Sequence, residues 1–211
     1  MAGHVSNAVI RRMPAYNRHL RELESEGIPR ISSQELGKRM GLTPSQIRQD
    51  INSIGGAGRQ GRGYNVTELR EYIRHYMGLD RPHRAIILGA GRIGIAVSRY
   101  QVFAREGYTM VALFDTDPEV VASVRGTPPV YEASELRERL PGLRADIAVL
   151  AVPAEAAQEA VELLYELGLR SVWNFAPVDL RYPEDMVVVN VHLSDSLNIL
   201  SYQMKCREEQ A

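Results

Sequence analysis

Two hydrophobic patterns follow one another along this chain, and they meet near Arg84. Before that residue, apolar side chains recur every three or four positions, which is typical of short amphipathic helices. After it, runs of consecutive apolar residues alternate with helical stretches, as in a parallel sheet whose strands are joined by helices. The pattern predicts a helical domain over residues 1–80, an α/β domain over residues 84–192 and a terminal helix within residues 193–211.

The helical domain carries clear start and stop signals. A first helix is expected to begin at Met13-Pro14 and to end at Gly27. Ser32 is followed three residues later by a glutamate, a capping-box pattern that starts a second helix, and Gly41 ends that helix. Thr43-Pro44 then starts a third helix. Two helices joined by such a tight turn predict a helix-turn-helix.

The helix from Pro44 to about Ile54 has two different faces. Ile47 and Ile51 are expected to pack inward. The opposite face carries hydrogen-bonding side chains and neither lysine nor glutamate: Ser45, Arg48, Gln49, Asn52 and Ser53. In the major groove Arg pairs with guanine, and Gln or Asn pairs with adenine. We therefore predict that this face binds DNA, together with Ser32 and Gln46 at the starts of the two helices; a merely solvated face is the alternative.

A glycine-rich stretch, residues 55–63, follows this helix. Its glycines would let backbone N–H groups approach phosphates, and Arg59 and Arg62 would neutralise phosphates or enter the minor groove. A short strand is expected at Tyr64–Val66, and Thr67 is expected to cap a last helix. Three helices and a glycine-rich hairpin predict a winged helix-turn-helix; for the loop alone, a flexible linker is the alternative.

The α/β domain opens with a dinucleotide-binding pattern. The apolar strand Ala85–Leu88 runs into a G-x-G-x-x-G segment made of Gly89, Ala90, Gly91, Arg92, Ile93 and Gly94. The glycines permit a tight turn, the approach of a pyrophosphate and close helix packing, and the helix N-terminus attracts the anion. Asp115, followed by Thr116 and Asp117, ends the next apolar run. A carboxylate there accepts hydrogen bonds from a ribose and repels a 2′-phosphate, which predicts NAD(H) as the cofactor; a helix-capping acid is the alternative.

Two later loops are expected at the carboxyl ends of strands, where ligands bind in parallel sheets. They consist of Ala151, Val152 and Pro153 and of Asn174, Phe175, Ala176 and Pro177. Both are predicted to line the nicotinamide half of the site, and Tyr100 is predicted to face the ring. Plain turns, and a core position for Tyr100, are the alternatives.

Charge is distributed unevenly along the chain, although the net charge is only −1. Residues 1–80 contain 12 Lys and Arg against 8 Asp and Glu, whereas residues 81–211 contain 13 against 18. A positive part suited to phosphates therefore adjoins a negative part. The sequence has one cysteine, no metal-ligand motif, no signal-like start and no apolar run of the ~20 residues that span a bilayer. We expect a cytoplasmic protein without a metal or a membrane segment.

The chain offers little for catalysis. A dehydrogenase needs an acid–base residue and a substrate pocket, usually from a second domain. The sheet is expected to extend to about Asn190, which leaves only the terminal helix within residues 193–211 and no substrate domain. The terminal helix carries an apolar stripe, Leu197, Leu200 and Met204, that fits a second subunit. We predict a homodimeric, DNA-binding regulator with no catalytic residues; a small NAD-dependent oxidoreductase is the alternative.

Taken together, these residues resemble the Rex family of bacterial redox-sensing transcriptional repressors over nearly the whole chain. The matching stretches are residues 31–36 (ISSQEL), 45–50 (SQIRQD), 61–66 (GRGYNV), 89–94 (GAGRIG), 114–118 (FDTDP), 152–154 (VPA) and 174–177 (NFAP). The resemblance implies a homodimer whose C-terminal helix is swapped between subunits. It implies binding to a palindromic operator, with Arg48 reading bases, and release when NADH accumulates. Genes of fermentation and respiration would be controlled.

The resemblance also bears on single residues. Tyr100 matches the family's nicotinamide-sensing tyrosine. Arg18 matches an arginine that pairs in some members with an aspartate across the dimer, but the position of that aspartate is His192 here. Gln49 and Gln60 stand where many members have lysine and arginine, so this chain carries less positive charge toward DNA.

Overall fold

The computed structural model describes residues 5–56, 63–126 and 128–209. It divides into two compact units, residues 1–81 and residues 82–211. The division lies close to Arg84, where the hydrophobic pattern of the sequence changes.

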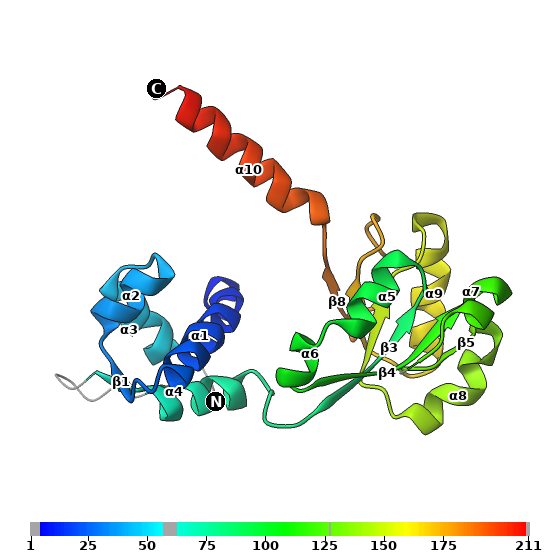
Figure 1. The fold of residues 1–211 in the computed structure, drawn as a ribbon, viewed down its shortest axis with the longest axis horizontal. Helices are drawn as coiled ribbons and strands as arrows, with labels where there is room; N and C mark the ends of the chain where they lie inside the picture. The colour runs from blue at the N-terminus through cyan, green and yellow to red at the C-terminus, as the bar shows by residue number, and fades with distance from the viewer. Residues whose placement is uncertain (1–4, 57–62, 127, 210–211) are drawn as a thin grey trace. The chain divides into compact units, whose positions relative to one another are not determined.

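The described part of the N-terminal unit combines helices with a two-stranded antiparallel sheet. In chain order its elements are α1 (Asn7–Ser25), β1 (Arg30–Ile31), α2 (Ser33–Met40), α3 (Pro44–Ser53), β2 (Tyr64–Asn65) and α4 (Val66–Tyr76) (Figure 1). Ser32 caps α2 through the expected capping box, and Gly41 ends it in the left-handed conformation with φ of 68°. Thr43 caps α3. The predicted helix-turn-helix is therefore present as α2, its turn and α3.

A single hydrophobic core holds these helices together. Its fully buried side chains include Met13 and Leu20 of α1, Ile47 and Ile51 of α3, and Ile73 of α4. The two isoleucines of α3 are those that the sequence pattern placed on the inward face. Their burial leaves the polar side of α3 outward.

Three details of this unit differ from the sequence prediction. Helix α1 begins at Asn7, and Pro14 lies inside it, because burial of apolar side chains in the first turns offsets the hydrogen bond that proline cannot donate. Helix α4 begins at Val66 and is capped by Asn65, whose side chain accepts the Glu68 N–H at 3.1 Å, so Thr67 is not the cap. Strand β2 pairs with β1, a short strand before α2 that the sequence did not predict, while the glycine-rich part of the predicted hairpin lies outside the described residues.

The C-terminal unit is a doubly wound parallel sheet, which confirms the predicted Rossmann fold. Its elements are β3 (His83–Leu88), α5 (Arg92–Arg99), α6 (Val102–Arg105), β4 (Tyr108–Asp115), α7 (Pro118–Ser123), β5 (Val130–Glu132), the 3₁₀ turn η1 (Ala133–Glu135), α8 (Leu136–Leu143), β6 (Ile147–Leu150), α9 (Ala154–Glu166), β7 (Ser171–Asn174), β8 (Val187–Asn190) and α10 (Leu193–Glu208). The strand order is β5-β4-β3-β6-β7-β8, and every neighbouring pair is parallel. The order reverses between β3 and β6, where such sheets bind their ligands. The short strand β5 was not predicted.

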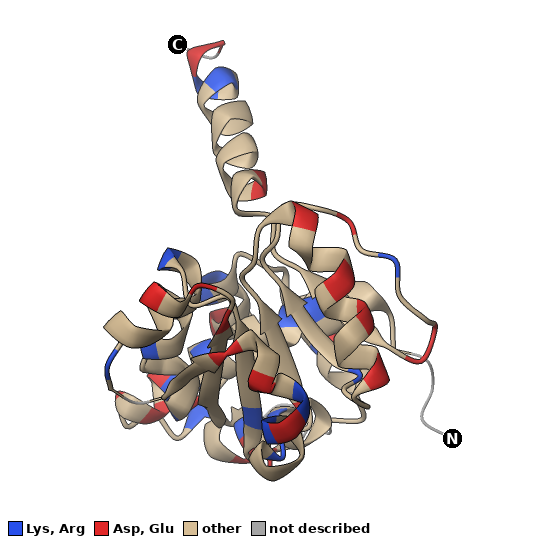
Figure 2. Cartoon of the chain, turned by 90° about the vertical axis from the view of Figure 1, so that its right-hand side faces the viewer, with Lys and Arg blue, Asp and Glu red and all other residues tan. Residues whose placement is uncertain are grey.

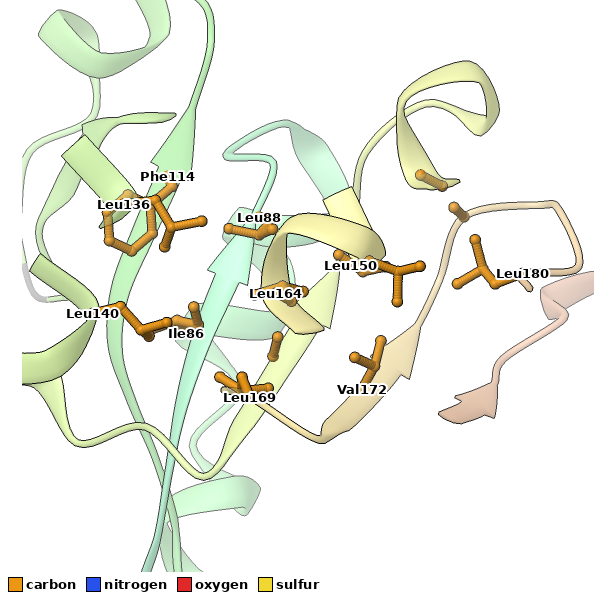
Figure 3. Packing of buried hydrophobic residues seen from close by; sticks show 14 of the residues in the cluster. Ile86, Leu88, Phe114, Leu136, Leu140, Leu150, Leu164, Leu169, Val172 and Leu180 are labelled. Carbon is orange, nitrogen blue, oxygen red and sulfur yellow. The ribbon is translucent and has the colours of Figure 1, made fainter. Parts of the chain in front are cut away.

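Alternate residues of the strands face two separate layers. Ile86 and Leu88 of β3 belong to the larger core, which α8 and α9 cover (Figure 3). Ile87, between them, packs with Val97 of α5 on the opposite face of the sheet. The central strand β3 is therefore buried on both sides, which explains its unbroken apolar run in the sequence.

Helix α10 leaves its apolar side chains exposed in the single chain. At least half of the surface of each of these side chains is accessible: Leu193, Leu197, Ile199, Leu200, Tyr202 and Met204. Charged residues lie only in the first and last turns of this helix (Figure 2). The predicted stripe is present, but Ile199 and Tyr202 lie outside it, so apolar surface covers more of the helix than a single face. Within the described residues, no helix is both long enough and apolar enough to cross a membrane.

Candidate functional site

The loop between β3 and α5 has the backbone that the glycine pattern predicts. Gly89 adopts φ of 94°, and a Cβ there would collide with the carbonyl oxygen of Ala151. A Cβ at Gly94 would collide with the carbonyl oxygen of Gly89, so α5 sits tightly against the turn. At both positions, therefore, a larger residue would push the loop out of shape.

Gly91 differs from these two glycines. It is exposed, it is the N-cap of α5, and no atom lies within 4 Å of a Cβ built on it. The first N–H groups of a helix lack partners within the helix and attract anions. Open space beside a helix N-terminus, reached over a residue without a side chain, suits a pyrophosphate. Arg92 and Ile93, the next two residues, are exposed in the first turn of α5.

Asp115 ends β4 and turns its carboxylate toward the glycine loop. Its Oδ2 accepts the N–H of Ala90 at 2.6 Å, and its Oδ1 accepts the N–H of Asp117 at 2.9 Å. Each carboxylate oxygen has a second lone pair, so both can still accept from a ribose hydroxyl. Asp117 in turn caps α7 by accepting the Glu119 N–H at 2.8 Å. The acid at Asp117, and not Asp115, is the helix cap.

A cavity of about 290 Å³ opens at this edge of the sheet. Its lining includes Gly89, Asp115, Thr116, Val152 and Pro153, so three of the loops singled out in the sequence meet there. Its walls are mostly apolar, with side chains of β3, β4, α8 and α9. Apolar walls with one well-placed carboxylate are the environment that an adenosine requires, and the residues present fit a dinucleotide.

The loop after β7 is organised by Asn174, which is fully buried. Its Nδ2 donates to the carbonyl of Val178 at 3.2 Å and to Oδ1 of Asn190 at 3.0 Å, while its Oδ1 accepts the Ala176 N–H at 2.9 Å. The side chain of Asn174 thus shapes the loop from within. Phe175 and the exposed Pro177 are left as the residues of this loop that a cofactor could reach.

Tyr100 follows α5 as its C-cap and is 56% exposed. Its ring lies 5.1 Å from that of Phe103, edge to face, and similar contacts continue to Trp173 and Phe175. An unbroken row of aromatic rings therefore runs from Tyr100 to the loop after β7. The ring of Tyr100 is exposed, so it is not a core residue.

The recognition face of α3 is open to solvent. Its exposed side chains are Ser45, Arg48, Gln49, Asn52 and Ser53. Arg48 donates from Nη1 to Oγ of Ser33 at 3.1 Å, which holds its guanidinium beside the start of α2. Ser33, which the sequence reasoning passed over, thus orients a predicted base-reading residue. Its position at the start of the predicted second helix, next to Ser32, could have indicated that Ser33 lies near α3.

Besides Arg48, three more of the predicted DNA-contact side chains already have partners inside the unit. The hydroxyl of Ser32 exchanges hydrogen bonds with Glu35 in the capping box, and that of Ser53 donates to the Asp50 carbonyl at 2.7 Å. Gln46 donates from Nε2 to Oδ1 of Asp50 at 2.8 Å, a buried partner that the sequence analysis did not single out. Arg59 and Arg62 lie outside the described residues, as does Gln60. Among the described residues, no cluster of His, Cys, Asp and Glu could hold a metal ion.

A helix-turn-helix unit with an exposed recognition helix, joined to a dinucleotide-type parallel sheet, defines the class of ligand-responsive transcription regulators. Comparison with known families agrees with both halves. A model described as "Putative DNA-binding protein N-terminus" matches residues 4–52, and one described as "CoA binding domain" matches residues 80–178.

Relatives match the chain over nearly its full length. The redox-sensing transcriptional repressor Rex of Caldanaerobacter subterraneus subsp. tengcongensis is 43% identical over 204 residues, 97% of this chain and 91% of that protein. The Rex of Clostridioides difficile is 44% identical over 202 residues, 96% of each chain. This chain belongs to the Rex family, and the resemblance stated from the sequence is confirmed.

Solved structures show the same architecture. RSP, a Rex-family repressor, in complex with NAD⁺ and operator DNA has a TM-score of 0.90 at 41% identity, covering 97% of this chain and 94% of its own. RSP in complex with NADH has a TM-score of 0.87 at 39% identity, covering 97% and 96%. The relatives are named as repressors, which supports the prediction of a regulator over that of an oxidoreductase.

Proposed function

We propose that this chain is a redox-sensing repressor that binds operator DNA through α3 and responds to NAD(H) bound at the carboxyl edge of its sheet. The observation that carries the proposal is the presence, in one chain, of a helix-turn-helix with an exposed polar face on α3 and of a glycine loop beside Asp115 and a cavity at the sheet edge. The complexes of RSP with NAD⁺ and operator DNA and with NADH support the same pairing of ligands.

The proposed cofactor contacts are those of the cradle. Gly89, Gly91 and Gly94 allow the pyrophosphate to reach the N-terminus of α5. Asp115 accepts hydrogen bonds from the adenosine ribose and repels a 2′-phosphate, which favours NAD(H) over NADP(H). Loop 151–153, the backbone of loop 174–177 and the exposed ring of Tyr100 are proposed for the nicotinamide half.

The proposed DNA contacts lie on α3. Arg48, Gln49 and Asn52 would read base edges, while Ser45 and Ser53 would contact the backbone or bases at the ends of the helix. Arg59 and Arg62 are proposed for the adjacent phosphates or minor groove. Because Gln49 is neutral, fewer condensed counterions would be displaced than with a lysine, which would weaken the salt dependence of binding.

We further propose a homodimer in which α10 packs on the partner subunit. The sheet leaves a groove of about 350 Å³ lined by apolar side chains, among them Phe103, Met110, Trp173 and Val189. Helix α10 presents uncovered apolar residues on more than one side, as expected of a helix that becomes enclosed in an assembly. A two-fold dimer matches a palindromic operator. We infer that it acts in the cytoplasm, where its DNA and its cofactor occur together.

The response depends on the difference in affinity of two domain arrangements for NAD⁺ and NADH. A ligand that binds one arrangement roughly 10⁴-fold more tightly than the other moves the population of the two arrangements from 1:99 to 99:1. The two cofactor forms differ by one positive charge and by the planarity of one ring, which loop 174–177 and Tyr100 are placed to distinguish. In the arrangement that NADH favours, the α3 helices of the two subunits would no longer match successive major grooves, ~34 Å apart.

The test is a titration of operator binding with NADH at constant NAD⁺. The operator is first selected from a randomised duplex pool by the protein itself. We expect NADH to release the selected duplex, and NADPH to be far less effective. Operator binding that does not respond to the NADH/NAD⁺ ratio would refute the proposal, as would failure to select any duplex.

A further inference from the structure

A carboxylate is buried inside the helix that faces DNA. Asp50 lies on the inward side of α3 between Ile47 and Ile51, and its side chain is fully inaccessible. Burying an ionised group is costly unless partners surround it. An acid in a DNA-reading helix would also repel phosphates if it turned outward.

Helix α1 supplies most of the partners of this carboxylate. Arg12 donates from Nε and from Nη2 to its two oxygens, each at 2.7 Å, in a bidentate fork. The buried hydroxyl of Tyr16 donates to Oδ2 at 3.0 Å. The fourth donor is the amide of Gln46, one turn earlier on α3, at 2.8 Å from Oδ1. Burial opposes the ionisation of Asp50, but the hydrogen bonds from Arg12, Gln46 and Tyr16 hold its pKa below its ordinary value.

The hydrogen bonds of Asp50 fix the rotation of α3 about its axis, which apolar contacts alone do not fix. Ile47 and Ile51 attach the helix to the core, but hydrophobic contact has no direction and tolerates rotation or sliding. A planar guanidinium that bonds both carboxylate oxygens allows a single arrangement. A buried ion pair adds little to stability compared with apolar packing, whereas it can specify one arrangement. At the C-cap of α3, four residues after Asp50, the hydroxyl of Tyr72 donates to the carbonyl of Ile54. The C-terminal half of α3 is therefore tied to α1 through Asp50 and to α4 through Ile54.

We propose that Asp50 is the positioning residue of the recognition helix: clamped by Arg12 and Tyr16, it fixes the rotation of α3 and so the direction in which Arg48, Gln49 and Asn52 meet the bases. Gln46 belongs to this clamp, and it takes no part in reading bases. The inference rests on the proposed function, because it presupposes that α3 reads an operator.

The experiment compares two affinities for each variant: for the operator duplex selected by the wild-type chain, and for a scrambled duplex of equal length and composition. Phosphate contacts contribute equally to both, whereas base contacts contribute only to the first. Loss of folded protein lowers both affinities by the same factor. The ratio of the two affinities therefore reports on the direction of α3 and is insensitive to stability.

We expect Asp50→Asn, which keeps the shape and removes the charge, to lower this ratio by about tenfold or more, the size of effect seen when base-specific contacts are lost. Tyr16→Phe removes one buried donor and should lower the ratio by a smaller factor, which keeps the test usable if Asp50→Asn folds poorly. Glu71→Gln removes one negative charge from an exposed site on α4 and should leave the ratio unchanged. Arg12→Gln combined with Asp50→Asn should lower it by less than the product of the single effects.

Unchanged ratios in both Asp50→Asn and Tyr16→Phe would overturn the proposal, as would equal losses on both duplexes that follow the melting temperature. Failure of the wild-type chain to prefer any duplex would instead remove the proposed function. The two failures are therefore distinguishable.

Discussion

At the scale of single residues, the cofactor site that we propose depends on one carboxylate, which touches both the glycine loop and the loop after β4. Asp115 accepts N–H groups from Ala90 and Asp117, so it braces the cradle before any ligand binds. The same oxygens face the cavity in which we place the adenosine. Asp115 therefore links loop shape to cofactor choice.

Replacing this carboxylate should weaken the redox response. A hydrogen bond to a charged acceptor is worth ~1.5–3 kcal/mol, so Asp115→Ala should raise the NADH concentration that releases the operator roughly tenfold to hundredfold. Operator affinity without NADH should change little. Fluorescence energy transfer from Trp173, the single tryptophan, to NADH measures the binding step. Asp179→Ala, at an exposed acid of the same unit, is the control; an unaltered NADH midpoint in Asp115→Ala would remove this residue from the site.

The Asp50 carboxylate also has a consequence for stability against pH. Its pKa is lower in the folded chain than in the unfolded chain, so its contribution is complete above the ordinary aspartate pKa of ~3.9. That contribution disappears as the pH falls through the lower, folded value. We expect the melting temperature of the wild-type chain to fall more steeply below about pH 4 than that of Asp50→Asn. Circular dichroism melts between neutral and acidic pH test this, and parallel curves for the two proteins would contradict it.

The residues that sequence alone could identify are those whose role is local. The glycines and Asp115 belong to one β–α–β unit, from β3 to the end of β4, whose geometry is set by residues close together in the sequence. The clamp on Asp50 could not be predicted, because its partner Arg12 is 38 residues away and its polar side chain sits among isoleucines. For Asn174 the sequence indicated a cofactor contact, but the structure buries its side chain inside its own loop.

At the scale of elements, helix α3 has an exposed polar face to which DNA could bind. Apolar residues on one side are buried, and polar residues on the other side are exposed. The hydrogen bond from Arg48 to Ser33 holds the arginine above the start of α2. Less side-chain entropy is then lost when Arg48 meets a base.

Shortening this arginine should weaken operator binding specifically. Arg48→Ala is expected to cost about 1–3 kcal/mol with the operator and to relax the base preference at one position. Ser33→Ala should cost less, because it only loosens the arginine. Competition assays against operators with each base substituted measure both effects. Equal affinity of wild type and Arg48→Ala for the operator would exclude this contact.

Helix α10 gives a prediction about assembly. Leu197→Asp with Leu200→Asp places two charges on its apolar stripe, where burial against a partner would no longer be favourable. We expect this variant to sediment as a monomer and to bind the palindromic operator at least about a hundredfold more weakly, because the linkage between the two half-sites is lost. Asn198→Asp, elsewhere on α10, is the control. A variant that still sediments as a dimer would contradict the proposed interface.

The elements that the sequence predicted correctly are those with strong local signals. A capping box marked α2, and a threonine followed by proline marked α3. Apolar runs marked β3 and β4, and loops expected at strand ends marked the ends of β6 and β7. The start of α1 was wrong, because Pro14 reads as a helix start although tertiary burial carries the helix through it. Strand β5 was missed because its three residues follow two prolines and are only partly buried.

At the scale of the whole molecule, we propose that a cofactor bound in the C-terminal unit changes the DNA binding of the N-terminal unit. A cofactor can act on DNA binding only if it binds more tightly to one arrangement of the dimer than to another. Neither the pattern of the sequence nor one chain of the structure contains the partner subunit, so the assembly had to be inferred from uncovered apolar surface.

The most direct test measures the separation of the two N-terminal units in the dimer. Cys206→Ser with Lys38→Cys leaves one exposed thiol on α2 of each subunit for a spin label, and pulsed dipolar spectroscopy reports the distance between the two labels. We expect one distribution of distances with NAD⁺ that is preserved when operator is added, and a clearly different one with NADH. Identical distributions with NAD⁺ and NADH, in a protein shown to bind both, would contradict this proposal.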